Sequence, residues 1–180
     1  MSGPTNMRGL NEFLSDVREC KDKEAETKRV EEELAKIRER FTTEKGLNAY
    51  QRKKYVWKLL YIHIRGYEVD FGYQEASALI TSTKYDEKYT GYIASGLIIP
   101  ETQEEVWKSI HYSVESDIKS RNEAAQSLAL SLLATIMPAA LSGLADTIFD
   151  LALSSRTSPT VRKKALVCLA RMVKKDPSRF

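Results

Sequence analysis

The clearest helical pattern in the chain lies in residues 49–66, which read AYQRKKYVWKLLYIHIRG. Asn48 precedes this stretch as an N-cap, and Gly66 is suited to end the helix. Between them no glycine or proline interrupts the chain, and the apolar residues recur at helical spacing. The stretch therefore predicts a helix from about Ala49 to Arg65.

The same pattern extends in both directions from this helix. Residues 24–41 are a charged run with one apolar stripe, so Glu26 and Glu33 are expected on its exposed face. The pattern predicts further helices through 75–80 and over 87–99, 102–118, 122–137, 139–153 and 159–174. No segment alternates with period two between turn signals, so we expect no sheet.

A weak internal repeat sets the expected architecture. A centre of small and aliphatic residues returns about every 35 residues, at 55–60, 90–94, 127–130 and 162–167. Pairs of helices at this period bury their apolar faces by stacking. We predict an all-α fold, an armadillo- or HEAT-like α-solenoid of antiparallel helix pairs, with an irregular helical bundle as the alternative. Residues 1–180 are expected to form one segment, with N-terminal helices to 41 and repeats from 42.

Composition limits the function classes. The chain has 28 basic and 25 acidic residues, and a net charge of +3 does not by itself indicate a nucleic-acid binder. The two cysteines, Cys20 and Cys168, are far apart and are expected to be reduced thiols. The N-terminus has no pattern of a signal peptide, and the most apolar window, 128–144, contains Pro138. We expect any membrane contact to be peripheral.

Catalytic motifs are missing from the sequence. The two histidines, His63 and His111, lie in no metal-binding spacing, and neither a glycine-rich phosphate loop nor a Gly-x-Ser-x-Gly elbow occurs. We therefore expect no enzyme, no metal and no cofactor.

A basic cluster is the most informative feature of the sequence. Arg52, Lys53 and Lys54 are consecutive, Lys45 precedes them and Lys58 follows, and tyrosines are interleaved. Several cations at a helix N-terminus favour a multiply phosphorylated headgroup at an anionic membrane. The alternatives are an ordinary solvated helix start and a contact with nucleic-acid phosphates.

Two smaller basic features have simpler interpretations. Residues 162–164, Arg-Lys-Lys, are expected on an ordinary exposed face. Arg18 lies among Asp16, Glu19 and Asp22, where a surface salt bridge is the simplest expectation.

Several of these stretches together resemble the N-terminus of the α-adaptins, the large subunits of the clathrin adaptor at the plasma membrane. The resemblance is densest up to Tyr92 and is carried by residues 7–10, 13–18, 28–30, 50–63, 66–72 and 162–169. The γ-adaptins of the Golgi and endosomal adaptor share the Lys-Leu-Leu-Tyr core. They lack the Arg-Gly-Leu opening and the unbroken basic run before Tyr55, so α-adaptin is favoured over γ-adaptin.

The resemblance implies a specific function. In α-adaptins the basic patch binds phosphatidylinositol 4,5-bisphosphate, and the matching residues here are Arg8, Lys45, Arg52, Lys53, Lys54, Tyr55 and Lys58. Arg52 stands where a lysine is usual. The N-terminal helices cradle the small σ subunit, and Arg18 resembles an arginine that reads the acidic residue of acidic dileucine cargo.

The resemblance also implies partners and a place in the cell. The expected partners are σ-, β- and μ-type adaptor subunits and no nucleic acid. The expected place is the cytoplasmic face of the plasma membrane, in clathrin-coated pits, and the cytosol. The chain is expected to be a trunk segment without hinge or appendage, and it departs from the family at 136–140, where glycine-rich turns are common. A purely structural scaffold without lipid binding is the competing interpretation.

Overall fold

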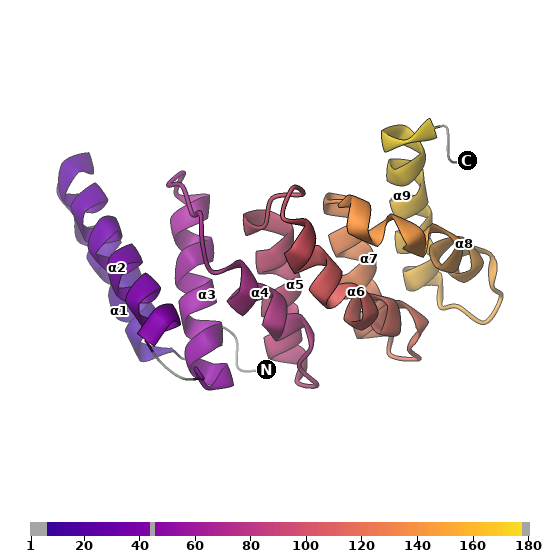
Figure 1. Ribbon diagram of the computed structural model, residues 1–180, viewed down its shortest axis with the longest axis horizontal. Coiled ribbons are helices and arrows are strands. Elements are labelled where there is room, and N and C mark those ends of the chain that lie inside the picture. Colours follow the sequence, from indigo (N-terminus) through magenta and orange to yellow (C-terminus); the bar gives the residue numbers. More distant parts are fainter. Residues whose placement is uncertain (1–6, 44–45, 178–180) are drawn as a thin grey trace. The chain divides into compact units, whose positions relative to one another are not determined.

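The computed structural model describes residues 7–43 and 46–177, and within those ranges it is helical and contains no strand (Figure 1). The predicted all-α class is confirmed. The chain divides into two compact units, Met1–Ile98 and Ile99–Phe180. The expected division into N-terminal helices up to 41 and repeats from 42 stays a prediction.

Each unit consists of consecutive helices with short connections. Unit 1 contains α1 (Arg8–Glu19), α2 (Lys23–Thr43), α3 (Ala49–Ile64), α4 (Tyr73–Ile80) and α5 (Tyr85–Ile98). Unit 2 contains α6 (Glu104–Lys119), α7 (Glu123–Thr135), the 3₁₀ helix η2 (Ala139–Leu144), α8 (Ala145–Leu153) and α9 (Pro159–Lys175).

The ends of α3 follow from local chemistry. The side chain of Asn48 accepts a hydrogen bond from the Gln51 amide at 2.9 Å, and the Gln51 side chain accepts one from the Asn48 amide at 3.0 Å. This reciprocal capping box satisfies two amides that the helix itself leaves unpaired. At the other end Gly66 adopts a φ of 89°, a conformation that favours glycine, so the chain turns there.

A glycine also sets how closely α4 and α5 approach. A Cβ added at Gly91 would lie 2.6 Å from the backbone nitrogen of Ile80 and 2.8 Å from the carbonyl carbon of Leu79. No side chain fits there without moving the α4 backbone. The core of unit 1 lies around this contact, with Leu59, Leu79 and Ile80 almost fully buried.

The predicted helix 139–153 is wrong in its first part. Residues 139–144 form the 3₁₀ helix η2, and only Ala145–Leu153 is an α-helix. Gly143 weakens an α-helix, whereas the threefold repeat of a 3₁₀ helix puts Leu141 and Leu144 on one side. Both leucines are buried, at 0% and 2% exposure.

The weak repeat corresponds to helix pairs within each unit. In unit 1, α3 contacts α5 through Lys53 with Asp86 and Trp57 with Thr90, both 33 positions apart. In unit 2, Lys164 of α9 contacts Ser131 of α7, also 33 positions apart. Successive contacts advance in the same direction on both helices of a pair. The two helices of each pair are therefore parallel, and the segment that connects them packs beside the pair. This agrees with a period of about 35 residues, because each contact joins residues 33 to 37 positions apart.

Candidate anion-binding site

The basic cluster occupies the first half of α3, and the helix spreads its side chains around the axis. Consecutive residues on an α-helix turn by about 100°. Arg52, Lys53, Lys54 and Lys58 therefore point toward four different neighbours, α4, α5, α1 and α2, and do not form one basic face. Each cation consequently has its own surroundings.

Lys53 points toward α5. Its side chain is 11% exposed, and its ammonium lies 2.5 Å from a carboxylate oxygen of Asp86 in the first turn of α5. The hydrogen bond from Lys53 lowers the pKa of Asp86 below its usual range. The charge of Lys53 is thus neutralised within unit 1.

Lys58 is the most enclosed cation of the cluster. Its ammonium lies 2.5 Å from Glu33 of α2, and both side chains are less than a tenth exposed. Arg29 also contacts Glu33 at 2.9 Å. Burial opposes the charge of Glu33, but the hydrogen bonds from Lys58 and Arg29 keep the pKa of its carboxyl below the usual range. The prediction that Glu33 lies on an exposed face is wrong, because a buried lysine requires a buried carboxylate.

Lys54 of α3 lies against the first turn of α1, at Gly9. A Cβ added at Gly9 would be 3.7 Å from Cδ of Lys54 and 4.0 Å from its ammonium nitrogen. That ammonium also lies 4.4 Å from the ring centroid of Tyr55, which packs against Phe41. Arg8 is exposed and pairs with its helix neighbour Glu12, at 2.8 Å. The structure therefore brings Lys54 to the backbone of α1 at Gly9 and over the ring of Tyr55, and Arg8 precedes Gly9 in the sequence.

Arg52 is half-buried beside α4. Its Nε atom is buried and has no hydrogen-bond partner among the described residues. Burial raises the pKa of Glu75 of α4, and the charge of Arg52 opposes that shift. Lys45, the remaining residue of the predicted site, lies outside the described residues.

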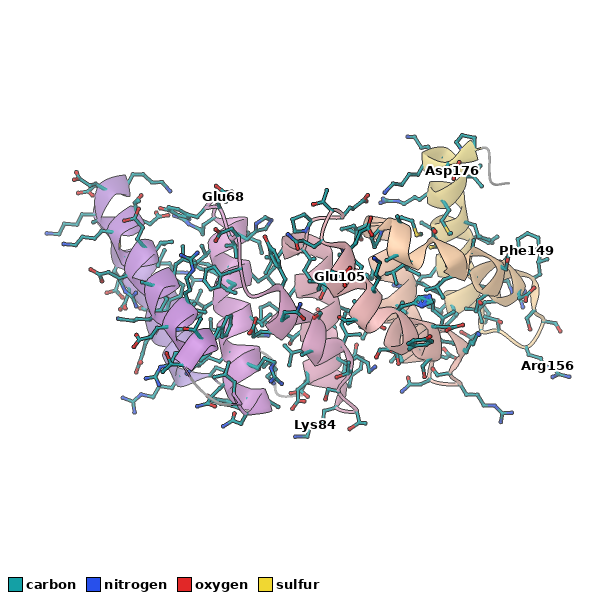
Figure 2. All side chains as sticks on the ribbon, viewed as in Figure 1. Glu68, Lys84, Glu105, Phe149, Arg156 and Asp176 are labelled. Carbon is teal, nitrogen blue, oxygen red and sulfur yellow. The ribbon has the colours of Figure 1, made fainter. Side chains whose placement is uncertain are left out.

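The N-terminal ends of α3 and α5 lie at the same end of unit 1. Because the two helices are parallel, Lys84, directly before α5, lies toward the end where α3 begins (Figure 2). Helix N-termini attract anions through their free amides and their dipoles. The cations Lys54 and Lys84 lie toward this end of unit 1, and Lys84 is 3.4 Å from Glu87, one of the two acidic residues in the first turn of α5.

Arg18 lies on the exposed side of α1. Within residues 7–43 and 46–177 it has no ion-pair partner, since Asp16 pairs with Arg29 at 3.0 Å instead. The surface salt bridge expected for Arg18 is therefore not formed in the part of the chain that the structure describes.

Glu26 is the second acidic residue of α2 for which the predicted exposed position is wrong. It is 7% exposed and accepts hydrogen bonds from Arg65 at 2.5 Å, from Lys23 at 3.1 Å and from Tyr67 at 3.0 Å. The hydrogen bond from Arg65 is the main reason that the pKa of Glu26 falls to about 2. These hydrogen bonds join α2 to the residues at the end of α3. The sequence does not indicate them, because Arg65 and Tyr67 are 39 and 41 positions from Glu26.

The described residues were also compared with the requirements of a metal site, a membrane-spanning helix and a reactive cysteine. Residues 7–43 and 46–177 contain no cluster of three or more histidine, cysteine or acidic side chains suited to a metal. No helix in those ranges is long and apolar enough to cross a membrane. Both cysteines are free, and burial raises the pKa of the Cys168 thiol to about 12.

Comparison with known proteins identifies a family that covers most of the chain. Residues 26–180 match the adaptin N-terminal region, a helical solenoid domain, in agreement with the predicted fold class. The chain is 48% identical over 174 residues, 96% of its length, to the AP-2 complex subunit alpha-1 of Arabidopsis thaliana. It is 42% identical over 172 residues, 95% of its length, to the AP-2 complex subunit alpha-2 of Dictyostelium discoideum.

A γ-type relative is less similar. The chain is 33% identical over 173 residues, 93% of its length, to the AP-1 complex subunit gamma-like 2 of Mus musculus, of which it covers 21%. It covers 17% of both alpha relatives, about a sixth of their length. The resemblance to α-adaptins is confirmed, and the preference for α over γ agrees with these identities.

Proposed function

The chain belongs to the family of the adaptin N-terminal region, and from that premise we propose that it is the membrane-binding part of a clathrin adaptor large subunit. It binds a multiply phosphorylated inositol headgroup at the end of unit 1 where α1 and α3 begin. Its place is the cytoplasmic face of the plasma membrane in clathrin-coated pits. The role is a scaffold for transport in endocytosis and requires no catalytic group.

The observation that supports this proposal most is the contact of the Lys54 side chain with the first turn of α1, at Gly9, the residue that follows Arg8. The two cations are 46 positions apart in the sequence, yet the Lys54 side chain lies over the backbone of Gly9, next to Arg8. Tyr55 completes this group with a ring beneath the Lys54 ammonium. Each cation near an anionic membrane contributes on the order of 1 kcal/mol, so several must act together.

Lys53 and Lys58 differ from Arg8 and Lys54 because they are largely buried and paired with carboxylates from other helices. Both ammonium groups are held by carboxylates of unit 1, Asp86 and Glu33. A headgroup that reached Lys53 would have to compete with the half-exposed Asp86. Lys58 is enclosed and fixes α3 against α2, so its contribution is to position the other cations.

A liposome co-sedimentation experiment tests the site. Vesicles containing phosphatidylinositol 4,5-bisphosphate, phosphatidylinositol 4-phosphate or charge-matched phosphatidylserine are compared. The variant is Arg8→Glu/Lys54→Glu, because the Arg8–Glu12 pair is exposed, whereas reversal of the largely buried Lys53 would bring two carboxylates together inside the fold at Asp86. The matched control is Lys28→Glu/Lys36→Glu on α2, which changes the same charge at exposed positions with no ion pair among the described residues.

We expect selective binding to the bisphosphate that weakens with salt and is lost in the Arg8/Lys54 variant but kept in the control. Equal loss in both variants would mean that only net charge matters and would contradict a site. Binding to none of the lipids would favour the scaffold without lipid binding, and preference for the monophosphate would favour the γ-type alternative. Comparable binding to RNA would favour the nucleic-acid interpretation.

We further propose that this chain assembles with σ-, β- and μ-type adaptor subunits and that Arg18 contacts acidic dileucine cargo beside the σ subunit. The support is that Arg18 is exposed and keeps its guanidinium free of described carboxylates. A planar guanidinium suits a carboxylate. An acidic dileucine peptide should bind the complex with the σ subunit and lose affinity in Arg18→Ala; unchanged affinity would remove Arg18 from the cargo site.

A further inference from the structure

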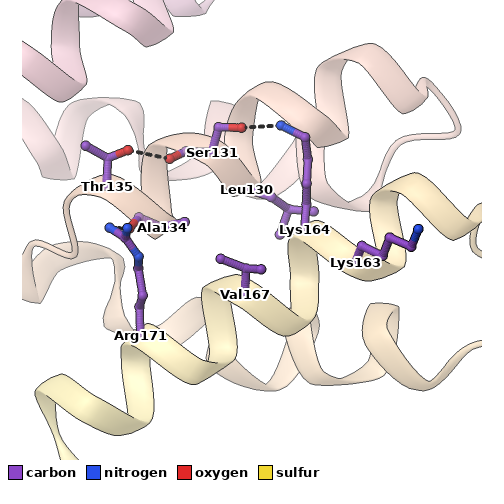
Figure 3. A pocket seen from close by; sticks show the side chains of 8 residues that line it. All are labelled: Leu130, Ser131, Ala134, Thr135, Lys163, Lys164, Val167 and Arg171. Carbon is purple, nitrogen blue, oxygen red and sulfur yellow. Dashed lines mark hydrogen bonds between the residues drawn. The ribbon is translucent and has the colours of Figure 1, made fainter.

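A groove lies between the parallel helices α7 and α9 of unit 2 (Figure 3). Its volume is about 320 Å³, and its floor consists of the apolar side chains of Leu130, Ala134 and Val167. Val167 is 54% exposed, although it lies in the middle of α9. An open apolar strip of this kind accepts the side chain of a ligand.

Cations border this strip. Lys163, Lys164 and Arg171 line the groove, and none of the described residues that line it is acidic. Within residues 7–43 and 46–177 none of the three forms an ion pair. The groove therefore carries positive charge that unit 2 does not neutralise.

Neutral acceptors hold two of these cations in place. The Lys164 ammonium donates to Oγ of Ser131 at 2.6 Å (Figure 3). It also donates to the carbonyl of Ser127 at 3.4 Å. Arg171 donates to the carbonyl of Ala134 at 2.5 Å. An ammonium has three donors and a guanidinium has five, so both retain donors for a ligand. Their positions are fixed before any ligand arrives, which lowers the entropy that binding would cost.

We propose that this groove binds an acidic segment of a partner protein in an extended conformation. Charge complementarity requires a negatively charged ligand, and the apolar floor requires one that also brings an aliphatic side chain. Lys164 and Arg171 are two helical turns apart, about 10.5 Å along the axis. An extended chain in the polyproline II conformation rises about 3.1 Å per residue with three residues per turn, so two acidic residues three positions apart lie on one side, about 9.3 Å apart, and match them. A phosphate headgroup offers no side chain for the floor.

The proposed site is independent of the headgroup site, because it lies in unit 2 and uses other residues. The competing explanation is that Lys164 and Arg171 serve only to join α9 to α7. Lys163 distinguishes the two explanations, since it is exposed, lines the groove and makes no hydrogen bond to α7 among the described residues.

The test is NMR titration of the ¹⁵N-labelled 180-residue chain. The probe is the hexapeptide Gly-Glu-Val-Ala-Glu-Gly, blocked at both ends, and its neutral counterpart has glutamine in place of both glutamates. We expect saturable shifts of amides in α7 and α9 with the acidic peptide only. The dissociation constant should rise about tenfold in Lys163→Glu and in Val167→Asp, since one reverses a charge and the other charges the floor.

Lys174→Glu is the matched control, because Lys174 is exposed on the same helix but does not line the groove. It should bind the acidic peptide as the unchanged chain does. Thermal unfolding followed by circular dichroism verifies that all variants fold.

Several results would overturn the proposal. One is equal binding of the neutral peptide, and another is the same loss in the Lys174 control as in the groove variants. If the peptide does not bind but phosphatidylserine vesicles do, and Lys163→Glu removes that binding, the groove is a membrane contact. If the chain dimerises in sedimentation experiments and Val167→Asp abolishes the dimer without peptide binding, the groove joins two copies of the chain.

Discussion

Unit 1 and unit 2 each join a pair of parallel helices through lysines, but they neutralise these lysines differently. In unit 1, α3 reaches its neighbours with Lys53 and Lys58, and each ammonium meets a carboxylate, Asp86 or Glu33. In unit 2, α9 reaches α7 with Lys164, which meets a hydroxyl and a backbone carbonyl. The carboxylates of unit 1 neutralise the charge of these lysines, whereas the neutral acceptors of unit 2 leave Lys164 with its positive charge.

The difference shows that a basic sequence cluster does not by itself give a basic surface. The cluster at 52–58 has four cations, one more than the run at 162–164, yet Lys53 and Lys58 are neutralised inside the fold. The run at 162–164 is expected to be an ordinary exposed face, and two of its residues, Lys163 and Lys164, line a groove whose charge stays available. Whether a cation can attract a ligand depends on which carboxylates the fold places beside it.

The largest effect should follow from removal of the buried carboxylate. In Glu33→Gln the Lys58 ammonium stays enclosed without its counter-charge, and the free energy of unfolding should fall by about 3 kcal/mol. Urea unfolding measures the change. The double variant Glu33→Gln/Lys58→Met should recover most of the loss, because both charges are then removed. No recovery would mean that Glu33 acts mainly through Arg29.

Acid should open unit 1 before unit 2. The pKa values of Glu26, Glu33 and Asp86 are lowered, that of Glu26 to about 2. A lowered pKa in the folded chain gives stability that is complete above the unfolded value, about 4.3 for Glu. This stability is lost as pH falls through the folded value toward 2. The α7–α9 contact uses no carboxylate and should persist longer.

The two tryptophans report this order, because Trp57 lies in unit 1 and Trp107 in unit 2. With 5-fluorotryptophan, the ¹⁹F resonance of Trp57 should change between about pH 4 and pH 2 at a higher pH than that of Trp107. Trp57→Phe assigns the signals. Coincident transitions would contradict the separate acid response of the two units.

A smaller effect is expected where a neutral hydroxyl holds the lysine. Ser131→Ala removes one acceptor of Lys164 but leaves the Ser127 carbonyl, so the free energy of unfolding should fall by about 1 kcal/mol. Urea unfolding beside Glu33→Gln gives a direct comparison. A loss as large as that of Glu33→Gln would mean that neutral and charged partners stabilise these lysines equally.

The smallest effect belongs to an exposed lysine. Lys163→Gln should change the free energy of unfolding by less than about 0.5 kcal/mol, as is usual for surface substitutions. Lys53→Gln, which removes the partner of Asp86, should cost more. If the two variants are equally stable in denaturant experiments, the ion pair of Lys53 does not contribute to unit 1.

Much of the fold could be predicted from local patterns. The capping signal at Asn48, the stop at Gly66 and the first-turn Pro159 placed helix ends within a few residues, because caps act over neighbouring residues. The same approach misplaced the start of α8, since a 3₁₀ turn is chosen by the burial of Leu141 and Leu144 and not by local propensity. The helix predicted over 87–99 includes Gly91, but the close approach of Gly91 to α4 is seen only once α4 and α5 are packed together.

The amino-acid sequence by itself determined the all-α class, most helix boundaries, the period of the repeat and the resemblance to adaptins, because these depend on residues near one another or on a shared pattern. Only the tertiary structure decided which charges remain free. Glu26 and Glu33 lie on a helix that reads as solvated, and their buried partners Arg65 and Lys58 are 39 and 25 positions away. The energy of an ion pair depends on distance and burial in space, and neither quantity is written in the order of the residues.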